Sequence, residues 1–512
     1  RRVLFRSYLP RYTEAAPGVP FTPQELERAV TQLHTNKAVA KPFLPAVVWK
    51  SAPHEVATFL FSQLVSWWNQ SPPTIPQAWK DSWLFFLPKP GKPNTHPSQL
   101  RPISLMEPLG KLVMGLLCTK IRDFLFPQLC CAPHFGFLPL RAATDAIRRV
   151  SAHSRSIRAL VATHRRTVQT QMGPNHKYKI CGGLSLFLDM TRAFDTACRR
   201  IICDHLFELG TPAHLVQLVA CWHENTHYNL VFRGNTTKVR VGKGLRQGCK
   251  IAPLLWVVFM DRFLQKLADK TGAEWIAAVV TIYADDVHFG CEFRSPHEFR
   301  LHLTNLGYAL DCLESLDLSI SYSKSFLLLR YRGTNPRPVL KGCIQRTSDG
   351  ASLLVPRQAG TPTALPLKNK GRYLGAVISY HSFEAQTWAH RKQAGWAAFN
   401  HVWPWLRNRQ LPFTKRIYLW KTCVHSVLTY SLLSVHVTLP VIHEYQVTVY
   451  QMIRKILGDH PYATHHSHQQ VFNLYSLAPP LDLLSSLAMG LLRRLSRRDQ
   501  LLQPNDFLCG LD

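Results

Sequence analysis

The chain has 512 residues, too many for one ordinary hydrophobic core, so two or three packed units are expected. It carries 61 Lys and Arg against 31 Asp and Glu, a formal net charge of +30. This charge excludes strongly basic partners, because like charges repel. The 13 cysteines form no CxxC pair and no Cys/His set with zinc spacing, which excludes a zinc module and a disulfide framework.

The charge balance predicts nucleic acid as the partner, with an anionic membrane surface or an acidic protein as the alternatives. No apolar run spans a membrane without interruption: the nearest, 426–447, is broken by His436, Pro440, His443 and Glu444. We therefore expect no membrane partner. Cysteine usage and the lack of a signal peptide predict an intracellular protein of the nucleus or the cytoplasm. Because the chain starts with Arg1-Arg2, it is expected to be cut from a longer polyprotein.

Residues 1–20 contain three prolines and are expected to be a linker. The stretch FTPQELERAVTQL predicts a helix, with Thr22 as its N-cap and Glu25 completing a capping box. Helical spacing recurs over 54–70, SWLFFLP predicts a strand, and a helix is expected over 102–128.

Further along, the polar and basic segment 151–180 predicts a helix followed by an exposed loop, and LSLFLDM predicts a buried strand. An amphipathic helix is expected over 201–222 and another helix over 296–315. Strands are expected near 228–242, 277–290, 324–331 and 373–380. After residue 383 the pattern becomes mostly helical, so the fold class is α+β with a domain boundary near 383.

Two apolar strands deliver acidic side chains. The stretch AAVVTIYADDVHFG holds Asp285 and Asp286 side by side, either at a loop tip in water or beside a bound cation that offsets their repulsion. Asp189 ends the run LSLFLDM, although it could simply cap the next helix. If these strands are neighbours, three carboxylates converge and can hold two divalent cations for in-line phosphoryl transfer. Asp285 is the stronger candidate, because Asp286 points the other way along the pleat unless the turn rotates it.

Between these strands lies GKGLRQGCKIAPLLW, where Gly244 and Gly248 allow a close backbone approach, or simply form a turn, ahead of a helix from about Pro253. Upstream, Lys89 and Arg101 stand next to apolar strands, where they could hold triphosphate oxygens or only favour solubility.

The motifs LPKPGKP with RPIS, FGFLPLRAATDAI, FLDMTRAFD, GLRQGCKIAPLL, YADD, SYSKSFLLL and RYLGAVIS stand in the order of reverse-transcriptase motifs. The chain resembles the reverse transcriptase domain of non-LTR (LINE-type) retrotransposons. This resemblance implies a right-hand polymerase fold, with an antiparallel palm sheet plus helices in the fingers and palm over 21–382. A helical thumb and C-terminal segment would occupy 383–512.

The resemblance also implies roles for single residues. Asp189, Asp285 and Asp286 would hold two Mg²⁺ ions, or Mn²⁺ instead, and the carbonyl of Met190 would be a further ligand. Phe194 would be a steric gate that favours dNTPs, with a core aromatic as the alternative. Lys324 would protonate the leaving pyrophosphate, unless it is only a surface lysine. The nucleotide-binding residues would be Lys89, Arg101, Phe194, Gln247, Gly248 and Tyr283.

The implied activity is RNA-directed DNA polymerisation with an RNA template, a DNA primer and dNTPs, and with the element's own RNA as a partner. The alternatives are an RNA-dependent RNA polymerase, which Phe194 argues against, and an inactive nucleic-acid-binding or maturase-like copy. The chain departs from the family at Leu140, where glycine is usual, and at Lys250, Ala252 and Arg192. The oligomeric state is not predicted.

Overall fold

A computed structural model describes residues 18–501 apart from positions 90, 92, 94, 130, 131, 164–178, 233, 349 and 460–463. Most of the expected N-terminal linker and the loop expected before residue 180 lie outside the described residues. The chain divides into two compact units. The first comprises the described residues up to 132, then 190–273 and 309–320, and the second comprises 133–189, 274–308 and 321 onward.

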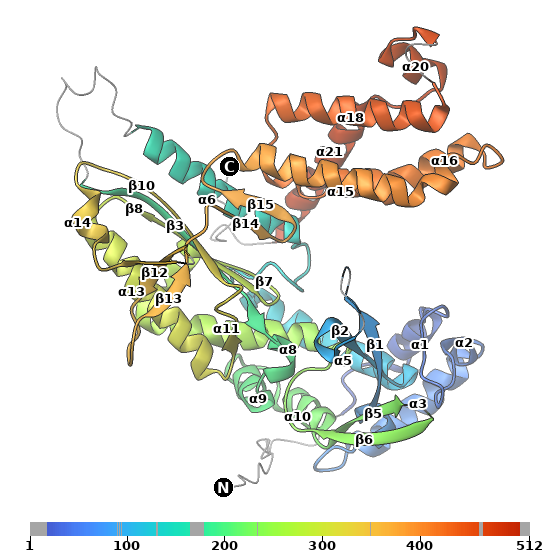
Figure 1. The fold of residues 1–512 in the computed structure, drawn as a ribbon. Coiled ribbons are helices and arrows are strands. Elements are labelled where there is room, and N and C mark those ends of the chain that lie inside the picture. The colour runs from blue at the N-terminus through green and yellow to red at the C-terminus, as the bar shows by residue number, and fades with distance from the viewer. Residues whose placement is uncertain are drawn as a thin grey trace. The chain divides into compact units, whose positions relative to one another are not determined.

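The first unit combines helices with a four-stranded sheet of order β2-β1-β5-β6 (Figure 1). Strand β1 is antiparallel to β2 and parallel to β5, and β5 and β6 form a hairpin. The strands of this sheet are β1 (Ser82–Pro88), β2 (Leu100–Leu105), β5 (Thr226–Phe232) and β6 (Asn235–Val241). Two short strands, β4 (Met190–Thr191) and β9 (Ser319–Ile320), pair separately. The helices are α1 (Pro23–Thr31), α2 (Ala46–Lys50), α3 (Pro53–Trp68), α4 (Gln77–Lys80), η1 (Pro97–Gln99), α5 (Pro108–Leu129), α8 (Ala193–Thr196), α9 (Arg199–Glu208), α10 (Ala213–His223) and α11 (Ala252–Thr271).

Helix α1 begins as the sequence predicts. The Thr22 hydroxyl accepts a hydrogen bond from the Glu25 amide, and the Glu25 carboxylate accepts one from the Thr22 amide, which forms the capping box. Phe21, which precedes the cap, packs edge-on against the fully buried Trp68 of α3, with ring centroids 5.7 Å apart. The cap therefore fixes where α1 starts, and the aromatic contact holds it against α3.

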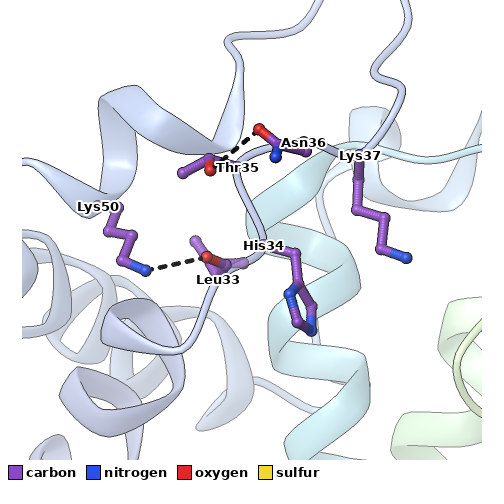
Figure 2. A pocket seen from close by; sticks show the side chains of 6 residues that line it. All are labelled: Leu33, His34, Thr35, Asn36, Lys37 and Lys50. Carbon is purple, nitrogen blue, oxygen red and sulfur yellow. Dashed lines mark hydrogen bonds between the residues drawn. The ribbon is translucent and has the colours of Figure 1, made fainter. Parts of the chain in front are cut away.

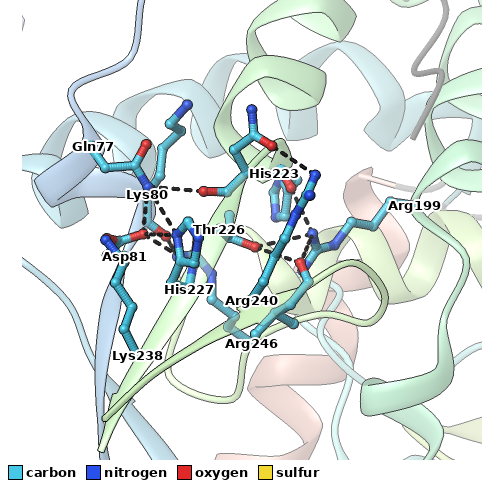
Figure 3. Close-up of polar contacts among 12 residues, drawn as sticks. Gln77, Lys80, Asp81, Arg199, His223, Thr226, His227, Lys238, Arg240 and Arg246 are labelled. Carbon is cyan, nitrogen blue, oxygen red and sulfur yellow. Dashed lines mark hydrogen bonds and ion pairs between the residues drawn. The ribbon is translucent and has the colours of Figure 1, made fainter. Parts of the chain in front are cut away.

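The buried carboxylate of Asp81 joins α4 to the sheet (Figure 3). One Asp81 oxygen accepts hydrogen bonds from the Gln77 amide group at 2.6 Å and from the His227 backbone at 3.0 Å, and Lys238 Nζ lies 2.8 Å from the other. Burial alone would raise the pKa of Asp81, but the hydrogen bonds from Lys238, Gln77 and His227 outweigh it and lower the pKa. Asp81 is thus held ionised as a structural anchor.

The second unit contains an antiparallel sheet of order β10-β3-β8-β7, and helix α6 lies across one of its faces (Figure 1). These elements are β3 (Cys181–Leu188), β7 (Val280–Tyr283), β8 (Asp286–Phe293), β10 (Phe326–Arg332) and α6 (Ala143–Thr163). Ile147, Val150 and Ile157 of α6 join Phe187 and Phe326 in one buried cluster. A side chain at Gly183 would collide with Ile157, so the close packing of β3 on α6 requires a glycine there.

Further elements complete the second unit. They are α12 (Ala273–Val279), α13 (Pro296–Ser315, shared with the first unit), α14 (Pro336–Leu340), the sheet of β11 (Ile344–Thr347), β12 (Gly350–Val355) and β13 (Thr363–Pro366), and the hairpin of β14 (Lys370–Tyr373) and β15 (Ala376–Ser379). The C-terminal helical part comprises α15 (Phe383–Leu406), α16 (Phe413–Trp420), η2 (Lys421–His425), α17 (Ser426–Thr429), η3 (Leu432–Ser434), α18 (Leu439–Leu457), α20 (His468–Leu474) and α21 (Pro480–Leu501). Its buried cluster includes Trp388, Phe399, Trp420 and Tyr445.

The mixed α+β content is confirmed, but three expected elements differ. Residues 100–105 form a strand, because they pair with β1, and the helix starts only at Pro108. The helix expected over 201–222 is two helices, separated at Gly210, which has φ +77°, and Pro212. The strand expected over 277–290 starts at Val280, because α12 continues to Val279.

Two expectations about chemistry can be compared with the described residues. None of the helices formed by these residues combines the length and the apolar character that crossing a membrane requires. The ten cysteines in the described part of the chain are all free, and five of them are buried.

Candidate active site

Strand register brings two of the predicted acids together. Strands β3 and β8 are hydrogen-bonded neighbours, as expected, and Leu188 is the partner of Val287. Continued by one residue, this antiparallel register sets Asp189 beside Asp286. The two apolar strands therefore deliver one carboxylate each to the same end of the sheet.

The YADD motif is a hairpin turn, as expected. Tyr283 ends β7 and is the partner of Asp286, the first residue of β8, so Ala284 and Asp285 form the turn. Ala284 has φ +53°, a left-handed conformation that non-glycine residues rarely adopt. A side chain at Gly136 would lie 2.7 Å from the Ala284 amide nitrogen, so the backbone of residue 136 packs directly against the turn.

The structure separates the two acids of the motif. Asp286 lines a cavity together with Asp189, whereas Asp285 is exposed at the turn. Pleat alternation relates neighbouring residues of one strand, and Asp285 is not in the strand. Asp286 is therefore the better placed partner of Asp189.

The cavity between these acids has a volume of about 110 Å³. Lys324 also lines it, and its Nζ lies 3.4 Å from Asp189 Oδ2. Arg372 and Tyr373 of β14 complete the polar lining. The Tyr373 hydroxyl is buried and has no hydrogen-bond partner among the described residues. Acids, bases and one unsatisfied hydroxyl thus face a common space.

The acids perturb one another. Burial, followed by the charges of Asp285 and Asp189, raises the pKa of Asp286 to about 7. Partial burial of the Asp285 carboxyl raises its pKa, and the Asp189 charge adds to the effect. Burial and then the charge of Asp286 raise the pKa of Tyr373 well above its usual value. Negative charge is therefore crowded at this end of the sheet.

The donor chemistry here suits a hard divalent cation, which takes carboxylate oxygens and offsets their repulsion. Asp189 and Asp286 would hold it, with Asp285 adjacent at the turn. Across the described residues, no group of three or more His, Cys, Asp or Glu side chains is arranged so that it could hold a metal ion. Two carboxylates line the cavity, and the role of all three as ligands stays a prediction.

In the first unit, backbone hydrogen bonds join three segments that carry other predicted residues. The Leu245 amide donates to the Phe194 carbonyl at 2.7 Å, and the Ser104 amide donates to the Gln247 carbonyl at 2.8 Å. Gly248 has φ +106°, and a side chain there would lie 2.7 Å from the Ser104 carbonyl oxygen. The RPIS motif, the GLRQG motif and the segment around Phe194 are thus one local structure within this unit.

Arg199 binds backbone carbonyls in and around the glycine-rich segment, and Figure 3 shows it near His223 and Thr226. Its buried guanidinium donates to the carbonyls of Gly244 at 2.8 Å, Val241 at 3.0 Å and His223 at 2.6 Å. Burial lowers the pKa of Arg199 to about 10, and the charge of Arg246 adds to this. The sequence gives no sign of this role, because it depends on where three carbonyl groups meet.

The remaining predicted residues also lie in the first unit. Phe194 is half-buried, and its ring stacks on Trp256 with centroids 4.8 Å apart. Arg101 is exposed on β2 as the partner of Leu87, and the Lys89 amide donates to the Gln99 carbonyl at 2.8 Å. Met190 is buried in β4 as the partner of Ile320. Nothing in these contacts tests the predicted nucleotide roles.

The sequence did not single out Arg372 and Tyr373, although RYLGAVIS was recognised as a motif. It did single out Leu140 as a departure. Leu140 has φ +59°, the conformation in which glycine carries no penalty, and its carbonyl accepts a hydrogen bond from Arg494 Nη1 at 3.0 Å. The usual glycine at this position therefore has a backbone reason.

Comparisons with known proteins bear on this arrangement. A sequence profile of the family described as reverse transcriptase (RNA-dependent DNA polymerase) matches residues 87–378, more than half of the chain. The RNA-directed DNA polymerase of the transposon X-element of Drosophila melanogaster is 24% identical over 315 residues, which cover 60% of this chain and 32% of that protein. The RNA-directed DNA polymerase of the mobile element jockey of Drosophila funebris is 24% identical over 279 residues, 53% of this chain and 28% of that protein.

The chain thus spans less than a third of the length of these relatives. Among solved structures, the apo telomerase of Candida tropicalis, truncated from its C-terminal domain, matches with a TM-score of 0.38 and 10% identity over 60% of this chain and 55% of that one. The family assignment rests on the sequence match. The chain belongs to the reverse transcriptase (RNA-dependent DNA polymerase) family.

Proposed function

We propose that this chain is the RNA-directed DNA polymerase of a non-LTR retrotransposon, which adds dNTPs to a primer 3′-hydroxyl. The observation that carries the proposal is the pair Asp189 and Asp286, set side by side on neighbouring strands at a cavity that Lys324 also lines. Family membership and the names of the relatives support the same reaction. The template would be RNA, the element's own transcript, and the primer would be DNA.

Asp189 and Asp286 would hold a divalent cation, Mg²⁺ or Mn²⁺, with Asp285 as the third predicted ligand. When bound, Mg²⁺ supplies Lewis-acid stabilisation of phosphate oxygens and lowers the pKa of the attacking hydroxyl. Asp286 must lose its proton before it binds the cation, because its pKa is about 7. The carbonyl of Met190 is kept as a further proposed ligand.

Other residues would orient the nucleotide and move a proton. Lys324 Nζ, 3.4 Å from Asp189, stands where it can stabilise or protonate the leaving pyrophosphate. The Phe194 ring, held by its stack on Trp256, would exclude a ribose 2′-hydroxyl. Lys89 and Arg101 would bind the triphosphate, and Gln247, Gly248 and Tyr283 would complete the nucleotide site.

We assign the parts of a right hand as follows. The β10-β3-β8-β7 sheet with α6 would be the palm, and the β2-β1-β5-β6 sheet with the helices of the first unit would be the fingers. Helices from α15 onward would form the thumb, which keeps the proposed boundary near residue 383, where α15 begins. Trp388 and Phe399 are buried in the helical core while Trp405 is exposed, which supports a thumb with an apolar core.

The net charge of +30 supports a nucleic-acid partner, because salt-dependent contacts with phosphates supply most non-specific affinity. Basic side chains also gather locally in the first unit. A cavity of about 320 Å³ is lined by His34, Lys37 and Lys50, and Lys50 Nζ donates to the Leu33 carbonyl at 3.3 Å (Figure 2). The intracellular location, nuclear or cytoplasmic, remains a proposal that follows from these partners.

Primer extension tests the function. Purified protein should extend a DNA primer on an RNA template with dNTPs and Mg²⁺. Asp189→Asn and Asp286→Asn should each lower the rate by at least about 10³-fold, because each removes a carboxylate from the site of charge development. Asp123→Asn, a change at an exposed acid of α5, is the matched control and should keep full activity.

Three results would contradict the proposal. Extension that persists in Asp286→Asn would remove Asp286 from the site. Tight RNA binding without extension by a folded wild-type chain would favour an inactive, maturase-like copy. Equal extension with rNTPs and dNTPs would instead favour an RNA polymerase.

A further inference from the structure

A second, larger cavity in the second unit plays no part in the proposed reaction. Its volume is about 660 Å³, within the range of small-molecule sites. One wall is helix α6, which presents Arg149, His153 and Ser156 at one-turn spacing. The facing walls come from the β7–β8 hairpin and from Trp275 and His302. The cavity is therefore built from several elements rather than from one loop.

Two guanidinium groups at this cavity have no carboxylate partner among the described residues. Arg149 is buried, and its hydrogen bonds in the described structure go to the Thr281 hydroxyl at 3.1 Å and to the Ala277 carbonyl. Burial lowers the pKa of Arg149 to about 10, as expected for a cation without a counter-charge. Arg155 has no ion pair or hydrogen bond with any described residue, and its Nε is buried.

Glu292, the acidic residue that lines this cavity, already has two other partners. Glu292 accepts a hydrogen bond from the Ser156 hydroxyl at 2.8 Å and forms an ion pair with Arg294 at 2.7 Å. It therefore does not neutralise Arg149 or Arg155. Two uncompensated positive charges favour an anion in this space and disfavour a metal ion at the nearby histidines.

The histidines add hydrogen-bonding groups. His288 is 1% exposed, lines the cavity, and neither of its ring nitrogens has a hydrogen-bond partner among the described residues. An imidazole ring offers hydrogen-bonding groups at both nitrogens, and a buried site leaves such groups unpaired only at a cost.

An aromatic side chain stands in the same wall. Trp275 Nε1 donates to His302 Nδ1 at 3.0 Å, so His302 carries its proton on Nε2 and donates it to the Glu292 carbonyl at 2.9 Å. These bonds fix the indole of Trp275 at the cavity. A flat aromatic ring beside neutral donors and acceptors suits a nucleobase.

We propose that this cavity binds one phosphate-bearing nucleotide unit, with the phosphate at Arg149 and Arg155 and the base beside Trp275 and His288. The ligand is either a free mononucleotide or the phosphorylated end of a single strand, since both present the same chemistry. This site is separate from the polymerase cavity and does not depend on catalysis.

Calorimetric titration tests the proposal on the full chain in EDTA, because the polymerase site should not bind nucleotides tightly without a divalent ion. The probes are AMP, adenosine, inorganic phosphate and a 5′-phosphorylated RNA pentanucleotide. AMP or the pentanucleotide should bind more tightly than adenosine or phosphate. If AMP binds more tightly than the pentanucleotide, the ligand is a free mononucleotide; if the pentanucleotide does, the ligand is the phosphorylated end of a strand. Binding of phosphate as tight as AMP binding would overturn the nucleotide assignment, and so would no binding of either nucleotide probe.

Variants locate the site. Arg155→Met should weaken AMP binding by about tenfold or more, the loss expected for one charge-assisted hydrogen bond. Arg148→Met, one residue from Arg149 on α6 but outside the cavity lining, is the matched control and should bind like wild type. His288→Phe keeps the ring shape and should weaken AMP more than phosphate. Equal AMP affinity in Arg155→Met and Arg148→Met would overturn the proposal, even if Arg149→Met fails to fold.

Discussion

Asp286→Asn should stabilise the metal-free protein while it abolishes the proposed activity. The wild-type carboxyl has its pKa raised from 3.8 to about 7 by burial and by the charges of Asp285 and Asp189. For a carboxyl with a raised pKa, the folded state is favoured while the proton is held. Stability is therefore lost as pH rises from about 4 through about 7. Asparagine keeps the shape of the neutral acid and cannot ionise.

The raised pKa of Asp286 sets how much the substitution stabilises the folded protein. About three pKa units at 1.36 kcal/mol each correspond to at most about 4 kcal/mol above pH 7, and about 1.7 kcal/mol at pH 5. Asp286 is only partly buried, and solvent screening reduces the gain to about 2–4 kcal/mol at pH 8. The variant should therefore unfold at a higher temperature than wild type in EDTA, with a larger difference at pH 8 than at pH 5.

Thermal unfolding in EDTA and in Mg²⁺, at both pH values, measures this. Mg²⁺ should raise the unfolding temperature of wild type at pH 8 and leave that of Asp286→Asn nearly unchanged, because the variant lacks one proposed ligand. Asp123→Asn serves as the control for an exposed acid. A variant that is destabilised, or stabilised equally at pH 5 and pH 8, would refute the mutual repulsion of these acids.

Three further changes test other contacts. Phe194→Val should lower the discrimination between dNTPs and rNTPs by about tenfold or more in primer extension, since it removes the ring that would exclude the 2′-hydroxyl; unchanged discrimination would leave Phe194 as a core aromatic. Arg199→Met should lower the free energy of unfolding, measured in denaturant, by about 3–5 kcal/mol, because three buried carbonyls lose their donor. The control Arg200→Met, at an exposed arginine, should lower it by less than about 0.5 kcal/mol. Leu140→Gly should raise stability by up to about 1 kcal/mol, and a loss of stability would show that the left-handed conformation is not strained there.

That Asp189 and the Asp285–Asp286 pair lie at strand ends could be predicted, because the neighbouring residues alone indicate it. Each apolar strand ends in a carboxylate, and the chemistry of paired acids asks for a common cation, so adjacency of β3 and β8 was a reasonable expectation. The ranking of Asp285 over Asp286 rested on one continuous pleat, which the structure does not have. A two-residue turn separates the strands, and the position of the turn is set by the partners Tyr283 and Asp286.

The errors in secondary structure have different physical sources. Residues 100–105 became a strand because their backbone groups pair with β1, which local periodicity does not show. The break at Gly210 and Pro212 was visible in the sequence, because glycine and proline together end helices. The helical start of 277–290 was also visible, since the preceding residues Ala273 to Val279 are rich in alanine.

The sequence could not predict contacts in which a buried charge binds backbone or hydroxyl groups in place of an opposite charge. Arg199 and Arg149 both stand in helical segments. Arg199 binds three carbonyls, whereas Arg149 is buried and has no counter-charge in the part of the chain that the structure describes. Burying an arginine is costly unless something compensates it. Carbonyl groups provide that compensation at Arg199, so its role is structural and is complete within the chain. At Arg149 only a hydroxyl and one carbonyl do so, and the missing compensation is the physical reason to look for an anion there rather than at Arg199.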